Sequence, residues 1–222
     1  MPAMSRLTLA IFAVFALGAC DPIARVPSSP TAVVGTRAVI LRSGQELLAE
    51  ITDVADKLVT TELFVRGESV AEFNSYRGLY IVSGRETHYQ YEVDFDETVL
   101  EQLFPLQVGN EVSFEGNTKN IDSGGSYDFW SNIQVVGEKT LPLSSGPRKV
   151  FVVDIITEHR SGARTKRKTN TVYFDPELAM VLKSVVHEDG YQNYWRVITV
   201  ERPGEGSGRT PRQQPRSGTV II

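Results

Sequence analysis

Residues 86–95 read Glu-Thr-His-Tyr-Gln-Tyr-Glu-Val-Asp-Phe, and from Tyr89 onward an aromatic or apolar side chain occupies every second position. Successive side chains of a β-strand point to opposite faces, so these residues separate into two sets. One face carries the apolar set: Tyr89, Tyr91, Val93 and Phe95. The other face carries the polar set: His88, Gln90, Glu92 and Asp94. The stretch therefore predicts a β-strand with one face turned to a core.

The same pattern continues on both sides of this stretch. Between residues 37 and 202, short alternating apolar runs are separated by turn residues, which is typical of a β-rich domain. Asp175-Pro176 suits a type I turn between two of these runs. The first predicted strand could also be a helix. We expect strands at 46–53, 58–65, 78–84, 86–95, 111–116, 127–136, 149–159, 171–174, 179–188 and 191–200.

One helix is predicted at 97–104, where Asp96 can cap the first turn and Pro105 ends the segment. The chain should therefore be mainly β, with about ten short, mostly antiparallel strands and one short helix. A sandwich, a closed barrel or a curved sheet wrapped on the helix would each satisfy this pattern. We expect an antiparallel curved sheet, sandwich or half-barrel, formed by a single β-rich domain at 37–202.

The N-terminus has the parts of a secretory signal. Arg6 precedes an apolar run of eleven residues, Leu7 to Leu17, which is too short to span a bilayer. Small residues follow, and the chain's only cysteine closes the run Leu17-Gly18-Ala19-Cys20. This arrangement resembles the lipobox of a bacterial lipoprotein. The alternative is an ordinary secretory signal with a fortuitous cysteine.

The lipoprotein resemblance implies how the chain is divided and where it lies. Residues 1–19 would be a signal peptide, and Cys20 would carry the acyl chains that hold the protein on a bacterial cell membrane, facing the periplasm. Residues 20–36 would be the lipid anchor and a Pro-rich tether. Asp21 resembles an enteric inner-membrane signal and favours that membrane over the outer one. The Pro-, Gly- and Arg-rich residues 203–222 are expected to be a disordered tail.

Two later stretches carry a second resemblance. One is Leu103-Phe104-Pro105-Leu106 followed by Gly109, and the other is Thr171 to Leu178 followed by Val181 and Lys183. They are similar to stretches of uncharacterised proteobacterial envelope proteins, which have no assigned enzymatic role. Some envelope lipoproteins with such strands are half-barrels that hold lipid or acyl chains. By analogy, the resemblance implies a curved sheet able to hold an apolar ligand.

The sequence carries no signature of catalysis or of a metal site. The three histidines, His88, His159 and His187, lack metal-ligand spacing, and we expect them to be structural or surface residues. Nucleophile-elbow, P-loop and dinucleotide-binding motifs are absent from the sequence. We therefore expect no metal, no cofactor and no enzymatic activity. The aromatic residues of the last predicted strand, Tyr191, Tyr194 and Trp195, are expected to pack in the core.

A basic run is the strongest surface feature. Five cations fall within nine residues around a predicted hairpin turn at 161–163: Arg160, Arg164, Lys166, Arg167 and Lys168. They form a candidate site for an anionic partner, either anionic lipid, an acidic envelope protein or a glycan polymer. A plainly solvated hairpin tip is the alternative. Nucleic acid is not an expected partner in the periplasm.

Three functions remain in competition. The first is a non-enzymatic envelope lipoprotein with a binding or assembly role. The second is a periplasmic carrier or chaperone that holds an apolar lipid or acyl chain in its curved sheet. The third is a hydrolase with an unrecognised site. An open apolar cavity of several hundred Å³ would favour the carrier, whereas a fully packed interior would remove it.

Overall fold

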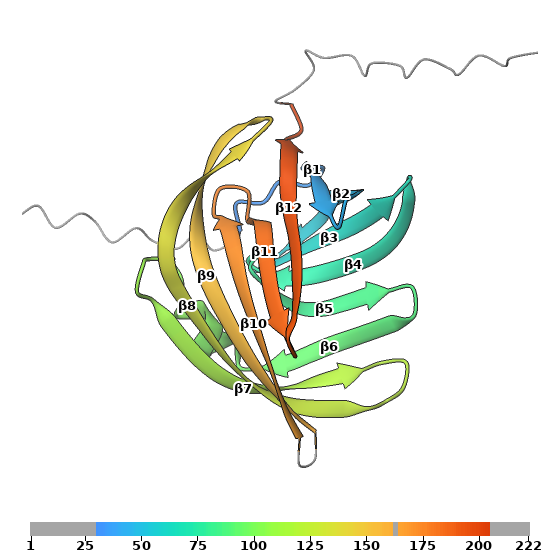
Figure 1. Ribbon diagram of the computed structural model, residues 1–222, viewed down its shortest axis with the longest axis vertical. Helices are drawn as coiled ribbons and strands as arrows, with labels where there is room; N and C mark the ends of the chain where they lie inside the picture. The colour runs from blue at the N-terminus through green and yellow to red at the C-terminus, as the bar shows by residue number, and fades with distance from the viewer. Residues whose placement is uncertain (1–29, 162–163, 205–222) are drawn as a thin grey trace, which may run out of the picture.

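The computed structural model describes residues 30–161 and 164–204 of the chain. In these residues it contains twelve β-strands and one short α-helix, and Figure 1 shows how the strands wrap around one another. In chain order the elements are β1 (Arg37–Arg42), β2 (Gln45–Ala55), β3 (Leu58–Val65), β4 (Glu68–Tyr76), β5 (Tyr80–Glu86), β6 (Tyr89–Phe95), α1 (Glu97–Glu101), β7 (Glu111–Asn120), β8 (Ser126–Leu143), β9 (Gly146–Ser161), β10 (Arg164–Asp175), β11 (Met180–Glu188) and β12 (Tyr191–Glu201).

The strands form a closed antiparallel barrel. Each strand pairs with its neighbours along the chain, and β1 also pairs with β12, so the sheet has no free edge. Arg37 marks the closure, because it lies opposite Glu50 of β2 and Glu201 of β12. The mainly β prediction with one short helix is confirmed. Of the arrangements that the pattern allowed, the closed barrel is the one that forms. The expected curved sheet, sandwich or half-barrel is wrong, because the first and last strands pair with each other.

The number and length of the strands also differ from the prediction. The segments that form β1 and β4 were not predicted as strands, and 46–53, which could have been a helix, lies in β2. β8 and β9 have 18 and 16 residues and are not short. They continue past Gly137 and Pro142 because each strand supplies backbone partners for the other along almost its whole length.

The face predicted from residues 86–95 is the inner face of the barrel. Tyr89, Tyr91 and Val93 of β6 line the interior, and Phe95 packs against Phe114 with the ring centroids 5.1 Å apart. The polar residues between them lie on the outer face, where Glu92 and Asp94 are exposed. The period-2 pattern therefore assigned this strand correctly.

The two ends of the barrel are built differently. At one end, which we call the closed end, β6 leads through α1 into β7, and the turns at 77–79 and 176–179 cover the interior. Leu79, Leu100, Leu103 and Leu178 are buried there. At the other end, which we call the mouth, short turns join the strands, and their residues at 43–44, 66–67, 87–88 and 189–190 are all exposed. The β3–β4 and β5–β6 hairpins, which end at the mouth, extend along the right side of Figure 1.

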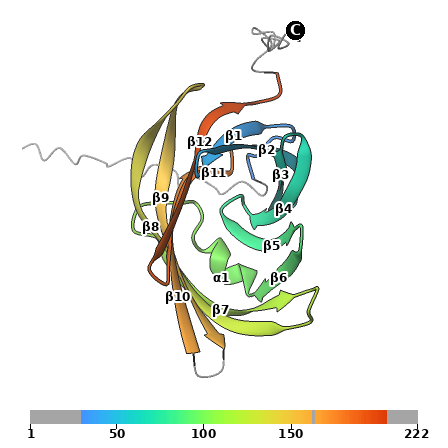
Figure 2. The same ribbon diagram turned by 45° about the vertical axis from the view of Figure 1, so that its right-hand side comes forward.

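Helix α1 belongs to the closed end and confirms the predicted cap. The Asp96 carboxylate accepts a hydrogen bond from the Thr98 N–H at 2.9 Å, and Figure 2 shows α1 between β6 and β7. The helix is shorter than the predicted 97–104, because Leu103 and Phe104 donate to the carbonyls three residues earlier and tighten the chain. Within the described residues, no helix reaches the length and apolarity that crossing a membrane requires.

The closed end depends on a close approach between two turns. Gly78 has φ +75°, and a Cβ atom added there would lie 1.8 Å from the Ala179 carbonyl oxygen. The Ala179 turn is held by Asp175, which is fully buried and accepts from the Leu178 N–H at 3.1 Å. Arg148 donates to the same carboxylate at 2.7 Å. The predicted turn after Asp175 is confirmed, and it forms one part of the wall that closes the barrel.

Candidate ligand-binding cavity

The barrel encloses a cavity of about 560 Å³. All twelve strands contribute side chains to its lining, which is mainly aliphatic and aromatic. This volume falls within the range of about 300–1,000 Å³ that small-molecule sites occupy. The interior of the barrel is therefore not fully packed.

The floor of the cavity lies at the closed end. It is formed by Leu79, Tyr80, Ala179 and Met180, which come from the two turns and the strands that follow them. The Tyr80 ring packs edge-on against Phe114 with centroids 5.4 Å apart. Burial raises the pKa of Tyr80 to about 12, so this hydroxyl stays neutral. The floor is thus uncharged.

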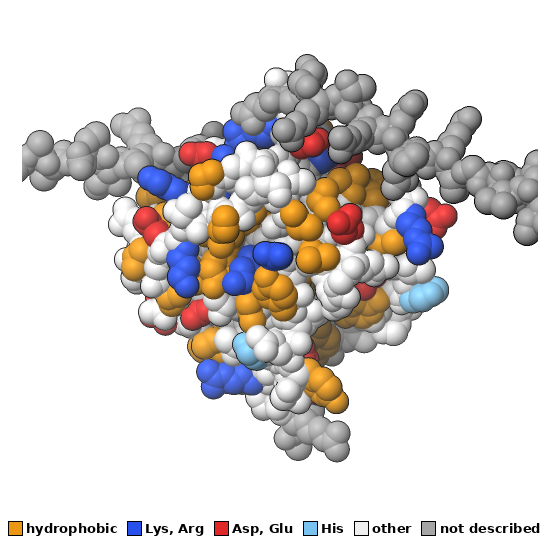
Figure 3. All heavy atoms as spheres, turned by 45° about the horizontal axis from the view of Figure 1, so that its top comes forward, with side chains coloured by type: hydrophobic (Ala, Val, Ile, Leu, Met, Phe, Trp, Pro, Cys, Tyr) orange, Lys and Arg blue, Asp and Glu red, His pale blue; other side chains and the backbone are white. Residues whose placement is uncertain are grey.

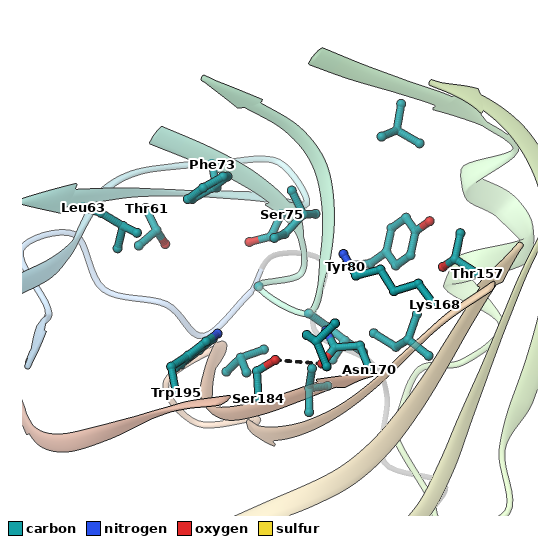
Figure 4. A pocket seen from close by; sticks show the side chains of 18 of the residues that line it. Thr61, Leu63, Phe73, Ser75, Tyr80, Thr157, Lys168, Asn170, Ser184 and Trp195 are labelled. Carbon is teal, nitrogen blue, oxygen red and sulfur yellow. Dashed lines mark hydrogen bonds between the residues drawn. The ribbon is translucent and has the colours of Figure 1, made fainter. Parts of the chain in front are cut away.

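The walls carry apolar side chains that remain partly exposed. Leu63, Phe73, Tyr91, Trp195 and Val186 are half-buried, although they lie on the inner face of a closed barrel. Their remaining exposure is therefore toward the cavity. Figure 4 shows Leu63 and Phe73 facing Trp195 across the open space. Such surface costs free energy when it is wet, at roughly 25 cal/mol per Å², and so it favours an apolar occupant.

Gly84 leaves room for the aromatic rings of Phe73 and Tyr91 in the cavity wall. A Cβ atom at this position would lie 2.7 Å from the Tyr91 ring and 2.8 Å from the Phe73 ring. Both distances are shorter than any ordinary carbon contact. The glycine on β5 therefore allows β4 and β6 to place aromatic rings side by side on the inner face.

A few polar groups lie among the apolar ones. Ser184 donates to the side-chain oxygen of Asn170 at 2.7 Å, as the dashed line in Figure 4 marks. Three basic residues, Arg42, His159 and Lys168, line the part of the cavity nearer the mouth. The described lining contains no Asp or Glu. The cavity is thus apolar at its floor and basic near its opening.

The structure divides the predicted basic run between the two faces of the β9–β10 hairpin. Lys166 lies opposite His159 and Lys168 opposite Thr157, so both lysines share the inner face. The neighbouring positions, Arg160 and Arg167, alternate to the outer face. The Arg164 side chain lies outside the described residues. The run is therefore not one cluster, and on the face in Figure 3 Lys and Arg are dispersed among other side chains.

Ion pairs involve two members of the run. Lys166 Nζ lies 3.5 Å from an Asp189 oxygen, and Arg167 lies 4.0 Å from a Glu158 oxygen. The first pair is exposed and the second is partly exposed, and such surface pairs contribute little to stability, about 0–1 kcal/mol. In the part of the chain that the structure describes, Lys168 has neither an ion pair nor a hydrogen bond through its side chain. It is the member of the run that lines the cavity.

His159 is the histidine that sequence reasoning missed. His88 and His187 are exposed, as expected, whereas His159 lines the cavity and stacks edge-on against Tyr127 at 5.1 Å. Burial and the positive charge of Lys168 lower the pKa of His159. Its Nδ1 atom is buried without a hydrogen-bond partner among the described residues. Strand alternation from Ile155 would have predicted its inward position.

The aromatic residues of β12 do not all pack in the core. Trp195 lines the cavity, but Tyr191 and Tyr194 are 82% and 41% exposed. The prediction of core packing is wrong for the two tyrosines, because alternation places Tyr194 on the outer face and Tyr191 begins the strand at the mouth. The described residues contain no group of three or more His, Cys, Asp or Glu side chains arranged for a metal ion.

The predicted lipidation site cannot be placed in this geometry. Cys20 and Asp21, the signal peptide and most of the tether lie outside the described residues, as do 205–222 of the predicted tail. Their assignments remain predictions from the sequence.

Fold and cavity together define a closed, twelve-stranded antiparallel barrel with an apolar interior. The chain is similar in structure to the hypothetical lipoprotein YmcC from Escherichia coli K12, with a TM-score of 0.52 and 12% identity over 76% of this chain and 88% of that one. No protein-family model and no curated protein sequence matches the chain.

Two further structures are similar at a TM-score of 0.45. One is a protein from Bacteroides fragilis NCTC 9343 provisionally assigned as exported, with a YmcC-like fold; it has 7% identity over 80% of this chain and 100% of that one. The other is provisionally assigned as a lipoprotein, from Parabacteroides distasonis ATCC 8503, with 9% identity over 79% of this chain and 100% of that one. The predicted resemblance of the domain to uncharacterised bacterial envelope proteins is confirmed at the level of the fold by the similarity to YmcC.

Proposed function

We propose that this protein is a membrane-anchored envelope lipoprotein whose barrel binds an apolar chain in its cavity, without catalysing a reaction. The observation that supports the proposal is the cavity of about 560 Å³, lined by apolar side chains that keep part of their surface exposed. This favours the carrier over a purely structural assembly role, which does not require an apolar cavity.

The proposed location rests on the sequence. The lipobox-like run ending at Cys20 supports lipid attachment at the N-terminus and a periplasm-facing domain. The fold shared with the hypothetical lipoprotein YmcC is consistent with this location. Anchoring would hold the barrel close to a membrane, and a membrane is a source of apolar chains.

Two adjacent valines allow a direct test of the cavity. Val186 lines the cavity, whereas Val185 is the preceding residue of β11 and points to the outer face. A Val186→Trp substitution fills space near the mouth, and Val185→Trp adds the same ring outside. Binding of the neutral apolar dye N-phenyl-1-naphthylamine is measured by fluorescence, with the full chain in nanodiscs of neutral phospholipid and empty nanodiscs as the blank.

We expect saturable dye binding to the parent chain and to Val185→Trp. Val186→Trp should bind about tenfold more weakly or worse, because an overfilled site cannot accept the dye. Equal binding by both variants, or no saturable binding by the parent chain, would show that the cavity does not hold apolar ligands.

A further inference from the structure

The ionisable side chains Arg42, His159 and Lys168 give the cavity lining a basic character. The chain as a whole carries a net charge of −4, with 27 acidic residues against 23 Lys and Arg. Even so, the thirty described residues that line the cavity include Arg42, His159 and Lys168 and no carboxylate. Although the chain is acidic overall, none of its described Asp or Glu side chains lines the cavity.

Lys168 is the most informative of these cations. It projects from β10 into the cavity in Figure 4, near Tyr80 and Thr157. It is half-buried and, in the described parts of the chain, has no ion-pair or hydrogen-bond partner. A partly desolvated ammonium group without a partner is costly, and an anion that enters the cavity would supply the missing partner.

The position of Lys168 fixes a direction along the cavity. On β10 it precedes the apolar Val172 by four residues, and Val172 lies toward the closed end. At about 3.3 Å per residue the two positions are roughly 13 Å apart along the strand. On β9, His159 and Ile155 show the same order, with the polar residue nearer the mouth. The cavity is therefore apolar at depth and cationic toward its opening.

We propose that the cavity binds a single-chain amphiphile with a carboxylate head, a fatty-acid-like anion, whose chain lies against the floor and whose head pairs with Lys168. This inference rests on the proposed function and names its ligand class. Arg42, on the β1 side of the mouth, contributes positive charge along the entry path, and His159 presents a polar ring beside Lys168. A neutral amphiphile of equal length lacks the head-group contact and should bind more weakly.

The test compares two ligands with the same number of carbon atoms, one with an anionic head group and one with a neutral head group. Decanoate and decanol compete with N-phenyl-1-naphthylamine for the full chain in neutral phospholipid nanodiscs. The parent chain should bind decanoate about tenfold or more tightly than decanol, because a charge-assisted contact strengthens one and not the other. Lys168→Met removes the ammonium and keeps the length of the side chain. Arg167→Met, on the outer face of the same strand, is the matched control.

We expect Lys168→Met to bind decanoate about tenfold more weakly and decanol as the parent does, while Arg167→Met changes neither affinity. In the parent chain, decanoate affinity should fall as NaCl rises from 50 to 500 mM, and this dependence should be reduced in Lys168→Met. These salt concentrations are about tenfold apart, enough to shorten the screening length by about threefold.

The outcomes separate the inference from the proposed function. If decanol and decanoate bind equally tightly and Lys168→Met changes neither, the head-group site is overturned and the apolar cavity stands. If the dye itself does not bind to the parent chain, both the head-group site and the proposed function fail. Loss of decanoate affinity in Arg167→Met as large as in Lys168→Met would show a general charge effect and would overturn the role of Lys168.

Discussion

The closed end and the mouth of this barrel differ in whether the charged side chains near the interior have ion-pair partners. At the closed end, Arg77 is 6% exposed and is held by two contacts with the Glu101 carboxylate, at 2.6 and 3.0 Å. Tyr76 also donates a hydrogen bond to that carboxylate, and Lys57 lies 3.6 Å from it. At the mouth, Arg42 and Lys168 line the cavity without an ion pair among the described residues.

This difference shows which part of the barrel serves the fold and which part is available for a ligand. Burial acts against ionisation of Glu101, but hydrogen bonds from Arg77 and Tyr76 outweigh it and lower the pKa of this carboxyl group. The closed end is therefore a satisfied network that fixes the turns around α1. At the mouth, Arg42 and Lys168 have no ion-pair partner among the described residues, and apolar side chains of the cavity wall remain partly exposed. Substitutions at the two ends should consequently differ in what they change.

The largest effect should come from Gly78 at the closed end. Gly78→Ala would place a Cβ atom 1.8 Å from a backbone oxygen, so the two turns must separate. We expect a loss of more than about 4 kcal/mol in the free energy of unfolding, measured by urea denaturation of the full chain.

Gly44 in the β1–β2 turn at the mouth is the matched control. It has φ +80°, close to the +75° of Gly78, but a Cβ atom there meets nothing within 4 Å. Gly44→Ala should therefore cost only the left-handed strain, about 1–2 kcal/mol. Equal losses for the two variants would show that backbone strain alone, and not the closed end's packing, determines stability.

The second effect compares two leucines. Leu100 of α1 has no exposed surface, whereas Leu63 is half-buried and already borders the cavity. Leu100→Ala should destabilise the fold by about 2–5 kcal/mol, and Leu63→Ala by about 1 kcal/mol, because less contact is lost. Urea midpoints of the two variants measure the difference. A larger loss for Leu63→Ala would mean that the cavity walls support the barrel as much as the closed end does.

The smallest effect should appear on acidification. His159 has a pKa lowered by burial and by Lys168 and Lys166, against an opposing influence from Glu188, and Tyr127 and Phe129 face it from β8. The unfolded chain therefore binds a proton at this site before the folded chain does. Stability should fall as pH drops through the ordinary histidine value, about 6.5, toward the lower folded value.

His159→Gln should remove this part of the pH dependence while His187→Gln, at an exposed position, leaves it intact. Unfolding free energies measured by urea titration between pH 5 and pH 8 test this, a range of about three units centred on the histidine value. An unchanged pH profile in His159→Gln would contradict the proposed environment of the ring.

The sequence predicted the inner face of the barrel but not its closure. Alternation at Tyr89, Tyr91 and Val93 is a local property of one strand, and it identified the cavity-facing side chains of β6. Closure depends on pairing between Arg37 and Glu201, which are far apart in the chain and show no local signal. Whether inward side chains meet or leave a cavity depends on the barrel's diameter, which residue types alone do not determine.

For the basic run, the sequence showed the positive charges correctly, but the prediction grouped them into one patch without assigning them to the two faces of the hairpin. Five cations at a hairpin tip suggest one patch when they are counted along the sequence. In paired strands, alternation sends Lys168 inward and Arg167 outward. The alternation rule that assigned β6 would have separated the run in the same way, had the predicted strands been extended to Ser161 and Arg164.

The most direct test of the central claim, that the cavity holds an apolar chain, uses the two tryptophans of the protein. Trp195 lines the cavity, and Trp130 lies on the outer face of β8 between the inward-facing Phe129 and Ser131. Bromine quenches tryptophan only at short range, so a bromine-labelled decanoate reports which ring it approaches. In Trp130→Phe, where Trp195 alone fluoresces, we predict saturable quenching; in Trp195→Phe we predict none. Equal quenching of both tryptophans, or of neither, would contradict the account.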